Sequence, residues 1–228
     1  MSSRYSICAT AEQVRERFAV DTPAGYTPRF NAAPGHLLPV ITNSGPQGLS
    51  FFYWGLDPAW AHSRPITEKI THVRLERIPE KPMYRKTLAQ RRCLVPADGF
   101  YEWKKIGKKT VIPYRFTRPD RNLFAFAGLW EEYDDGEEHF HTFTIITLPE
   151  PVEGAERLPA ILNAGDEKAW LDNTLTESAW LSLIKPYAPS QLDSYTVSPR
   201  INSLTANDPG LIAPAPPADQ FGNLTLFD

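Results

Sequence analysis

The chain has little cysteine, no long apolar run and no leader pattern, and each of these absences excludes a class of protein. Two cysteines among 228 residues, Cys8 and Cys93, are too few for a disulfide framework and suit a reducing cytosol. No Cys/His cluster has the spacing of a zinc site, so we expect neither a metal nor another cofactor. No apolar segment approaches the ~20 residues that span a bilayer, and the first residues show no signal-peptide pattern. We therefore expect a cytoplasmic protein that does not contact membranes.

Proline is abundant instead, and short predicted elements accompany it. The 22 prolines against 13 glycines predict frequent turns, while a hydrophobic fraction of 42% suffices for a buried core. Short aromatic and β-branched stretches predict strands at 36–41, 49–54, 92–95, 114–117, 123–130 and 141–147. Helices are expected at Thr10–Phe18, with Thr10 as N-cap, at Asp166–Leu171, capped by Asn163 or Asp166, and at Thr176–Leu183.

These elements predict an α+β fold, with an antiparallel, barrel-like β-sheet and several short helices. Asp134-Asp135-Gly136 lies between two predicted strands and is typical of a hairpin turn. No linker divides the chain, so we expect one domain over 1–212, followed by a proline-rich tail, 213–228. From Pro209 onward the chain is expected to be extended or partly disordered. We expect the protein to be a monomer.

The net charge of −3 conceals a strong asymmetry along the sequence. Residues 1–118 hold 19 Lys and Arg against 9 Asp and Glu, and residues 119–228 hold 5 against 18. The two halves thus carry +10 and −13. A basic half favours polyanion binding, because neutralised phosphates release counterions. The same residues are equally consistent with ordinary solvated charges in a fold whose halves pack together.

Several motifs follow one another along the chain in a recognisable order. They are the start Met1-Ser2-Ser3-Arg4, FNAAPG at 30–35, the block 54–60, VPADGFYEWKK at 95–105 and VSPRIN at 197–202. In this order and spacing they resemble the SRAP family, the SOS-response-associated peptidases or abasic-site processing proteins. The resemblance implies a bacterial, nucleoid-associated protein of the DNA damage response. It also implies a single domain with a groove for single-stranded DNA, ending in a pocket for an abasic sugar.

The resemblance implies four catalytic groups, and the first of them is altered here. In the family, the residue after the initiator Met is a cysteine, whose free amine and thiol close a thiazolidine ring on the sugar aldehyde. Ser2 takes that position. Once Met1 is removed, the Ser2 amine can still form a Schiff base, but a hydroxyl is a far weaker nucleophile than a thiolate. The alternative is that Ser2 is simply a terminal residue tucked against the fold.

His72 and Glu102 occupy two further positions of this constellation. His72 stands where the family has an asparagine, and it is either a new acid/base group or a filler of the vacated space. Glu102, in FYEWK, matches the family's acid/base glutamate. In a pocket lined by Phe100 and Trp103 its pKa is expected to rise, as proton shuttling requires. The alternative for Glu102 is an ion pair with a neighbouring lysine or arginine.

The fourth catalytic position has lost its chemistry. The stretch GAERLPAIL at 154–162 aligns with the family's H-D-R-M-P-V-I-L, so Ala155 replaces a histidine that assists opening of the sugar ring. An alanine cannot carry a proton. Ala155 is therefore predicted to be a disabled catalytic position.

Candidate DNA contacts are better retained than the catalytic groups. Arg4, Arg74 and Arg157 are predicted phosphate clamps, because a guanidinium fork matches phosphate oxygens. Trp60 is a candidate stacking platform for an unpaired base. Packing in the core would equally explain that tryptophan.

The sequence leaves three functions open. The first is a protein that binds single-stranded or abasic-site DNA without forming the stable thiazolidine crosslink. The second is an attenuated abasic-site lyase that acts through a Schiff base at the Ser2 amine. The third is an N-terminal-nucleophile peptidase or amide hydrolase in which the Ser2 hydroxyl attacks, and no oxyanion hole is evident in the sequence to support it.

Overall fold

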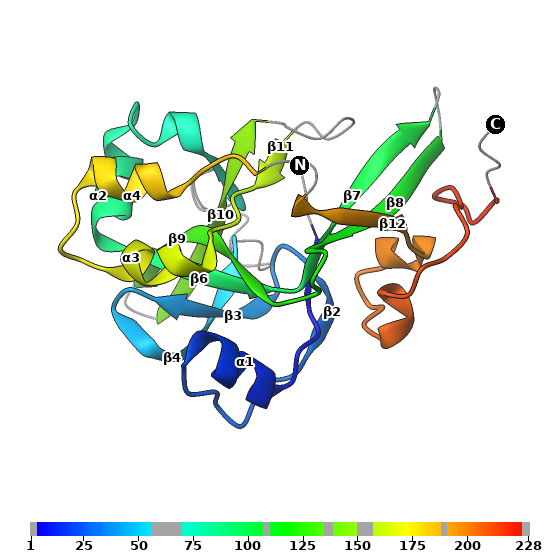
Figure 1. The fold of residues 1–228 in the computed structure, drawn as a ribbon, viewed down its shortest axis with the longest axis horizontal. Helices are drawn as coiled ribbons and strands as arrows, with labels where there is room; N and C mark the ends of the chain where they lie inside the picture. The colour runs from blue at the N-terminus through cyan, green and yellow to red at the C-terminus, as the bar shows by residue number, and fades with distance from the viewer. Residues whose placement is uncertain are drawn as a thin grey trace.

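Two β-sheets and a few short helices build the protein (Figure 1). The computed structural model describes residues 4–55, 70–106, 110–134, 139–149, 157–187 and 191–224. Its strands are β1 (Tyr5–Ile7), β2 (Arg29–Ala32), β3 (Leu37–Thr42), β4 (Gly45–Trp54), β5 (His72–Arg74), β6 (Arg92–Ala97), β7 (Gly99–Ile106), β8 (Thr110–Thr117), β9 (Phe124–Asp134), β10 (His139–Pro149), β11 (Arg157–Pro159) and β12 (Asp193–Thr196). Its helices are α1 (Ala11–Phe18), α2 (Pro82–Gln90), α3 (Glu167–Leu171) and α4 (Glu177–Leu183), with 3-10 turns η3 (Leu75–Arg77), η4 (Ala164–Asp166), η6 (Pro199–Asn202) and η7 (Pro209–Leu211).

Five strands of the larger sheet close into a barrel. Their order is β10-β4-β3-β6-β9, and β9 pairs with β10 again. The pairing is antiparallel except where β10 runs parallel to β4 and, further along, to β5. β6 and the first seven residues of β9 are buried throughout, because the barrel interior covers one face of each strand and neighbouring elements cover the other. The expected α+β fold with a barrel-like sheet is confirmed.

The smaller sheet has the order β12-β8-β7-β1-β2 and is antiparallel throughout. Figure 1 shows β7, β8 and β12 on the right of the view, beside the barrel. β1 lies between β7 and β2, so one of the first segments of the chain is an interior strand of this sheet. That position brings the start of the chain to the first residues of β7, where Tyr5 is the register partner of Phe100.

Two helices, α1 and α4, begin at side-chain caps, and α2 begins at Pro82, which has no backbone amide that needs a partner. Thr10 caps α1 as predicted, in a capping box with Gln13, and Thr176 caps α4. At the start of α3 neither Asn163 nor Asp166 makes a capping hydrogen bond, so that expectation is wrong. The preceding 3-10 turn η4 leads directly into α3 instead.

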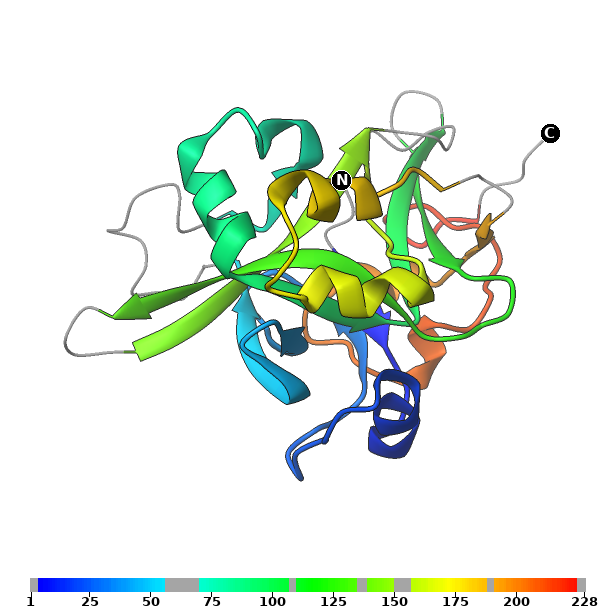
Figure 2. The same cartoon turned by 60° about the vertical axis from the view of Figure 1, so that its left-hand side comes forward.

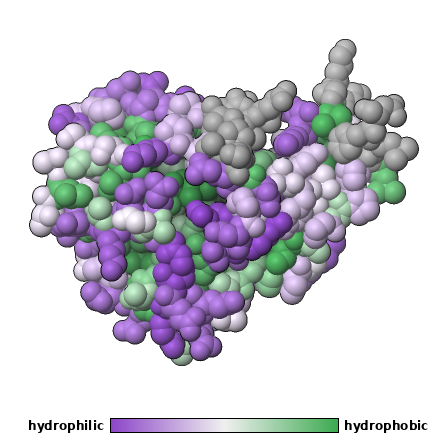
Figure 3. Space-filling view, viewed as in Figure 1, coloured by the Kyte–Doolittle hydropathy of each residue, from purple (hydrophilic) through white to green (hydrophobic). Residues whose placement is uncertain are grey.

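Three helices gather on one side of the barrel, whereas α1 is mostly solvated. α2 and α3 pack on β6, α2 also packs on β9, and α4 contacts both helices, as the left side of Figure 1 shows. Only Val14 of α1 is buried, and the surface over this helix is hydrophilic at the bottom of Figure 3. Among the described residues, no helix is long and apolar enough to cross a membrane.

Part of the segment after Pro209, the residues Ile212 to Ala215, is hydrogen-bonded to the end of β12. The segment begins with the turn η7, whose Leu211 is fully buried. The Thr196 hydroxyl donates to the Ala215 carbonyl at 2.6 Å. Prolines leave this segment few amide donors, and the hydroxyl and backbone groups near β12 supply the partners.

Candidate functional site

Three predicted site residues, His72, Arg74 and Arg157, lie on the two short strands that flank Thr147 of β10. On one side its register partner is Arg74 of β5, two residues after His72. On the other side its partner is Pro159 of β11, two residues after Arg157. Because strand side chains alternate, His72 and Arg74 point to the same face of β5. Arg74 is exposed there and His72 is half-buried.

Arg157 is held by a dense set of acceptors within the protein. Its two terminal nitrogens donate to the Glu76 carboxylate at 2.8 Å each. It also donates to the Thr147 carbonyl at 2.9 Å and to the Thr147 hydroxyl at 3.1 Å. Hydrogen bonds from Arg157 lower the pKa of Glu76. This geometry is that of a positioning residue, and the predicted phosphate contact of Arg157 stays a prediction.

His72 rests against a tryptophan that joins it to β1. Its ring packs edge-on against Trp54, with centroids 5.4 Å apart, and its Nδ1 lies 2.9 Å from the Thr71 hydroxyl. Trp54 is almost fully buried and donates to the Thr71 carbonyl at 2.9 Å. The Tyr5 ring lies 5.2 Å from that of Trp54. This packing fits a space-filling histidine and its partial exposure fits an acid/base group, so both interpretations of His72 stay open.

The beginning of the described chain lies beside Glu102. The Arg4 carbonyl accepts a hydrogen bond from the Tyr101 amide at 3.0 Å, and the next residue along β7 is Glu102, which is only 6% exposed. Ser2 precedes Arg4 by two residues. Ser2 itself lies outside the described residues, as do Trp60 and Ala155.

Alternation along β7 corrects the expected lining of the Glu102 site. Phe100 and Glu102 point to one face of the strand, and Tyr101 and Trp103 to the other. Phe100 belongs to the main core, whereas Trp103 packs in a separate cluster and donates from Nε1 to Asn202 at 2.9 Å. The prediction that Trp103 lines the Glu102 pocket is therefore wrong.

Tyr187 is a neighbour of Glu102 that the sequence did not indicate. Its hydroxyl donates to the Pro159 carbonyl at 3.2 Å, which ties it to β11. Burial and the nearby Glu102 carboxylate raise the pKa of Tyr187 well above its usual value. Tyr187 follows Pro186 in an irregular segment after α4, and no motif marks it.

Two arginines and a histidine lie near one another at β1 and β2. Arg4 directly precedes β1, Arg29 begins β2, and His36 lies in the β2–β3 connection. Burial lowers the pKa of Arg4. Burial also lowers the pKa of His36, and the positive charges of Arg29 and Arg4 lower it further. Arg29 was missed by the sequence analysis because it belongs to none of the motifs used there.

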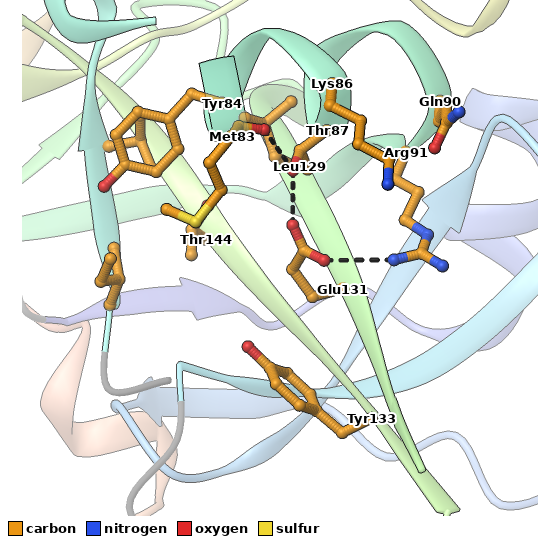
Figure 4. Close-up of a pocket in the computed structure, with 12 residues that line it drawn as sticks. Met83, Tyr84, Lys86, Thr87, Gln90, Arg91, Leu129, Glu131, Tyr133 and Thr144 are labelled. Carbon is orange, nitrogen blue, oxygen red and sulfur yellow. Dashed lines mark hydrogen bonds and ion pairs between the residues drawn. The ribbon is translucent and has the colours of Figure 1, made fainter. Parts of the chain in front are cut away.

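A cavity of about 280 Å³ lies between α2 and the strands β9 and β10 (Figure 4). The alternation of side chains along β5 places it on the opposite face from His72. Val73, which alternates with His72, lines it together with Tyr84 and Tyr133. The Glu131 carboxylate in its wall is bonded to the Thr87 hydroxyl at 2.5 Å and to Arg91 at 3.1 Å. This cavity is therefore separate from the candidate site.

The fold and the site define a small α+β protein whose first strand lies beside a buried glutamate, and comparison with known proteins identifies its family. Residues 1–204 match the family model SOS response associated peptidase (SRAP). The chain is 40% identical over 222 residues to the abasic site processing protein YoqW of Bacillus subtilis, covering 93% of this chain and 99% of that protein. It is 38% identical over 213 residues to YobE of the same organism, covering 89% and 97%. The chain belongs to the SRAP family.

A solved structure shares the fold. The crystal structure of a protein from Bacteroides thetaiotaomicron matches with a TM-score of 0.82 and 28% sequence identity. The match covers 93% of this chain and 99% of the other. Nearly the whole architecture is therefore shared with that protein.

Proposed function

We propose that this protein binds single-stranded or abasic-site DNA in a DNA damage response without forming a stable thiazolidine crosslink. Relatives such as YoqW are abasic site processing proteins, which supports DNA as the partner. One observation carries the proposal: the Arg4–Tyr101 hydrogen bond anchors the start of the chain beside the buried Glu102, and residue 2 is a serine. The acid/base residue is kept and the thiol is missing.

The chemistry open to Ser2 explains why a lasting adduct is not expected. A free Ser2 amine attacks the aldehyde carbon of the opened sugar and forms a carbinolamine. Glu102 donates a proton to the departing hydroxyl, so water leaves and an imine forms. A cysteine thiolate would then add to the imine carbon and close a ring. The serine hydroxyl adds weakly, so hydrolysis returns the amine and the aldehyde.

Phosphate binding is assigned to exposed or cationic groups around this site. Arg74 on β5 is exposed, and the two arginines Arg4 and Arg29 lie near β1. Guanidinium groups suit phosphate oxygens. Trp60 is proposed as the base-stacking residue. A monomeric state and a cytoplasmic, nucleoid-associated location are proposed as well.

Intact-mass and gel analysis of the Met1-processed protein with an abasic single-stranded oligonucleotide tests the proposal. We expect salt-sensitive binding and no adduct when no reductant is added. Ser2→Cys should give only part of the crosslink, because Ala155 carries no proton, and Ser2→Cys combined with Ala155→His should give more. Glu102→Gln in that double variant is the matched control, expected to lower the adduct yield and to keep binding. A durable reductant-free adduct of the parent protein at Ser2 contradicts the proposal.

The retained Glu102 favours a second candidate function, an attenuated lyase. The Ser2 imine would then lead to β-elimination and strand cleavage. This function predicts strand cleavage, together with an adduct that borohydride traps and that disappears when Met1 is retained. The reversible imine of the first function would also be trapped, but without strand cleavage. An amide hydrolase, the third possibility, predicts instead that acyl or sulfonyl reagents label the Ser2 hydroxyl. Cleavage without trapping would rule out the imine route.

A further inference from the structure

Three metal-binding side chains share one face of the ribbon formed by β9 and β10. His139 and His141 are two residues apart on β10 and therefore point to the same side. Glu132 of β9 is the register partner of His141, directly across the ribbon. Figure 2 shows the paired ends of these green and lime strands extending to the lower left. About 20 Å of strand separates His141 from Thr147 at the candidate DNA site.

The ligand atoms already lie close to the spacing of a metal site. The Glu132 Oε1 atom is 2.7 Å from Nε2 of His139 and 3.9 Å from Nε2 of His141. The three ligand atoms all lie within 4.8 Å of one another. A tetrahedral zinc ion with bonds of about 2.0–2.1 Å spaces its ligands about 3.3 Å apart. Small side-chain rotations would therefore convert the hydrogen-bonded cluster into a coordination shell.

Neighbouring aromatic and charged groups orient the cluster. The His141 ring stacks on Phe52, with centroids 4.6 Å apart and planes at 12°, and it also contacts Trp130. The His139 ring meets His141 edge-on at 5.0 Å. The second oxygen of Glu132 lies 3.5 Å from Arg91. Supporting contacts of this kind hold metal ligands in place.

We propose that Glu132, His139 and His141 bind one Zn²⁺ ion, with water in the fourth position. Two imidazoles and one carboxylate suit zinc better than magnesium or calcium, which prefer oxygen ligands alone. The His139 side chain is 50% exposed and that of His141 30% exposed, so an ion reaches them from solvent. The ion joins β9 to β10 and stabilises the ribbon. The site is independent of the proposed DNA chemistry.

Calorimetric titration of the chelator-treated, tag-free full chain with zinc chloride tests the site. We expect one ion per chain and a thermal unfolding midpoint that rises with zinc. His139→Ala, at the most exposed ligand, should weaken zinc binding at least about tenfold while the circular dichroism spectrum is unchanged. His36→Asn, away from the ribbon, is the matched control and should bind zinc like the parent.

Cobalt gives a second readout, because tetrahedral Co²⁺ with nitrogen ligands absorbs strongly in the visible range. The parent should show this band, and Glu132→Gln and His139→Ala should lose it. An absence of zinc binding by the parent overturns the proposal. So does unchanged zinc affinity of His139→Ala.

Discussion

The Arg157 side chain ties β11 to β10 and η3, because it donates to Thr147 and to Glu76. Arg157→Ala removes all of these donors and leaves the Thr147 carbonyl without them. We expect it to lower the free energy of unfolding by about 2–3 kcal/mol. Glu76→Ala should cost less, since the Glu76 side chain is 47% exposed and such pairs are screened by water. Urea unfolding at pH 7 measures both, and a larger loss for Glu76→Ala would contradict this account.

The same pair predicts a pH dependence. The Arg157 hydrogen bonds lower the pKa of Glu76 below its ordinary value of 4.5, so the folded protein holds this proton less tightly than the unfolded chain. The pair's contribution to stability is present above the ordinary value and is lost as the pH falls through the lowered one. Between about pH 5 and about pH 3 the parent should therefore lose more stability than Glu76→Gln. Urea midpoints across this range give the comparison, and parallel curves would refute it.

Motifs located some residues of the candidate site and had no means of locating others. Glu102 and His72 lie in stretches that match the family, so their positions followed from sequence. Tyr187 approaches Glu102 only after the irregular segment following α4 is folded against β11. The partner of Arg157 was likewise hidden, because Glu76 is an ordinary exposed glutamate in the sequence. These contacts form only through tertiary packing, so a local sequence pattern cannot predict them.

Among the elements, α1 has the most complete cap. The Thr10 amide donates to the Gln13 side-chain oxygen at 2.8 Å, and the Thr10 hydroxyl accepts a hydrogen bond from the Gln13 backbone amide. Thr10→Ala should lower the free energy of unfolding by about 1 kcal/mol. Thr10→Ser keeps the hydroxyl and should cost little. Urea unfolding distinguishes the two, and equal losses would show that the hydroxyl is not what matters.

Gly128 of β9 lies between β6 and β10, where the neighbouring atoms leave no room for a side chain. A Cβ atom at Gly128 would lie 2.8 Å from Cys93 Sγ and 3.0 Å from the Thr144 carbonyl oxygen. Gly128→Ala should therefore destabilise the protein by about 2 kcal/mol through overpacking of the barrel. Cys93→Ala in the same chain should recover part of that loss, because it removes the nearest atom. A double-mutant cycle by urea unfolding checks this coupling, and additive losses would count against it.

Element length decided which strands the sequence predicted. The long barrel strands β4, β9 and β10 were located, although β4 begins earlier than predicted, β9 ends later, and β10 is longer at both ends. β1, β5 and β11 have three residues each, too few to show alternation. β7 was missed for another reason: Phe100 and Tyr101 are both buried, in different clusters, so its apolar residues do not alternate with polar ones. The capped helices were predictable from their first residues, but α2, which begins at Pro82 without a side-chain cap, was not.

At the scale of the whole molecule, part of the charge asymmetry joins the two halves of the chain. Arg17 pairs with Glu167, Arg85 with Glu177 and Arg91 with Glu131. Arg92 is fully buried against Trp180, and burial lowers its pKa to about 10. Because these arginines are paired with carboxylates or buried, they do not form a free surface for binding phosphates. The sequence did not reveal this, because it counts charges without showing their partners.

The remaining exposed cations should determine the salt dependence of DNA binding. If Arg74 contacts a phosphate, Arg74→Ala should reduce the slope of log affinity against log salt by about 0.7 for single-stranded DNA. Arg85→Ala is the matched control, because Arg85 is also exposed but is paired with Glu177. Fluorescence anisotropy over a salt series measures both slopes. Equal slopes for the two variants would remove Arg74 from the interface.

The interior position of β1 also sets an order of events during synthesis. β1 leaves the ribosome well before its partner β7, which begins at Gly99, and β11, which carries Arg157, follows later still. The edge formed by residues 5–7 thus waits for almost a hundred further residues before β7 covers it. The candidate site is consequently assembled late, and a nascent chain halted before β11 carries Ser2 and Glu102 without the strand that completes their surroundings.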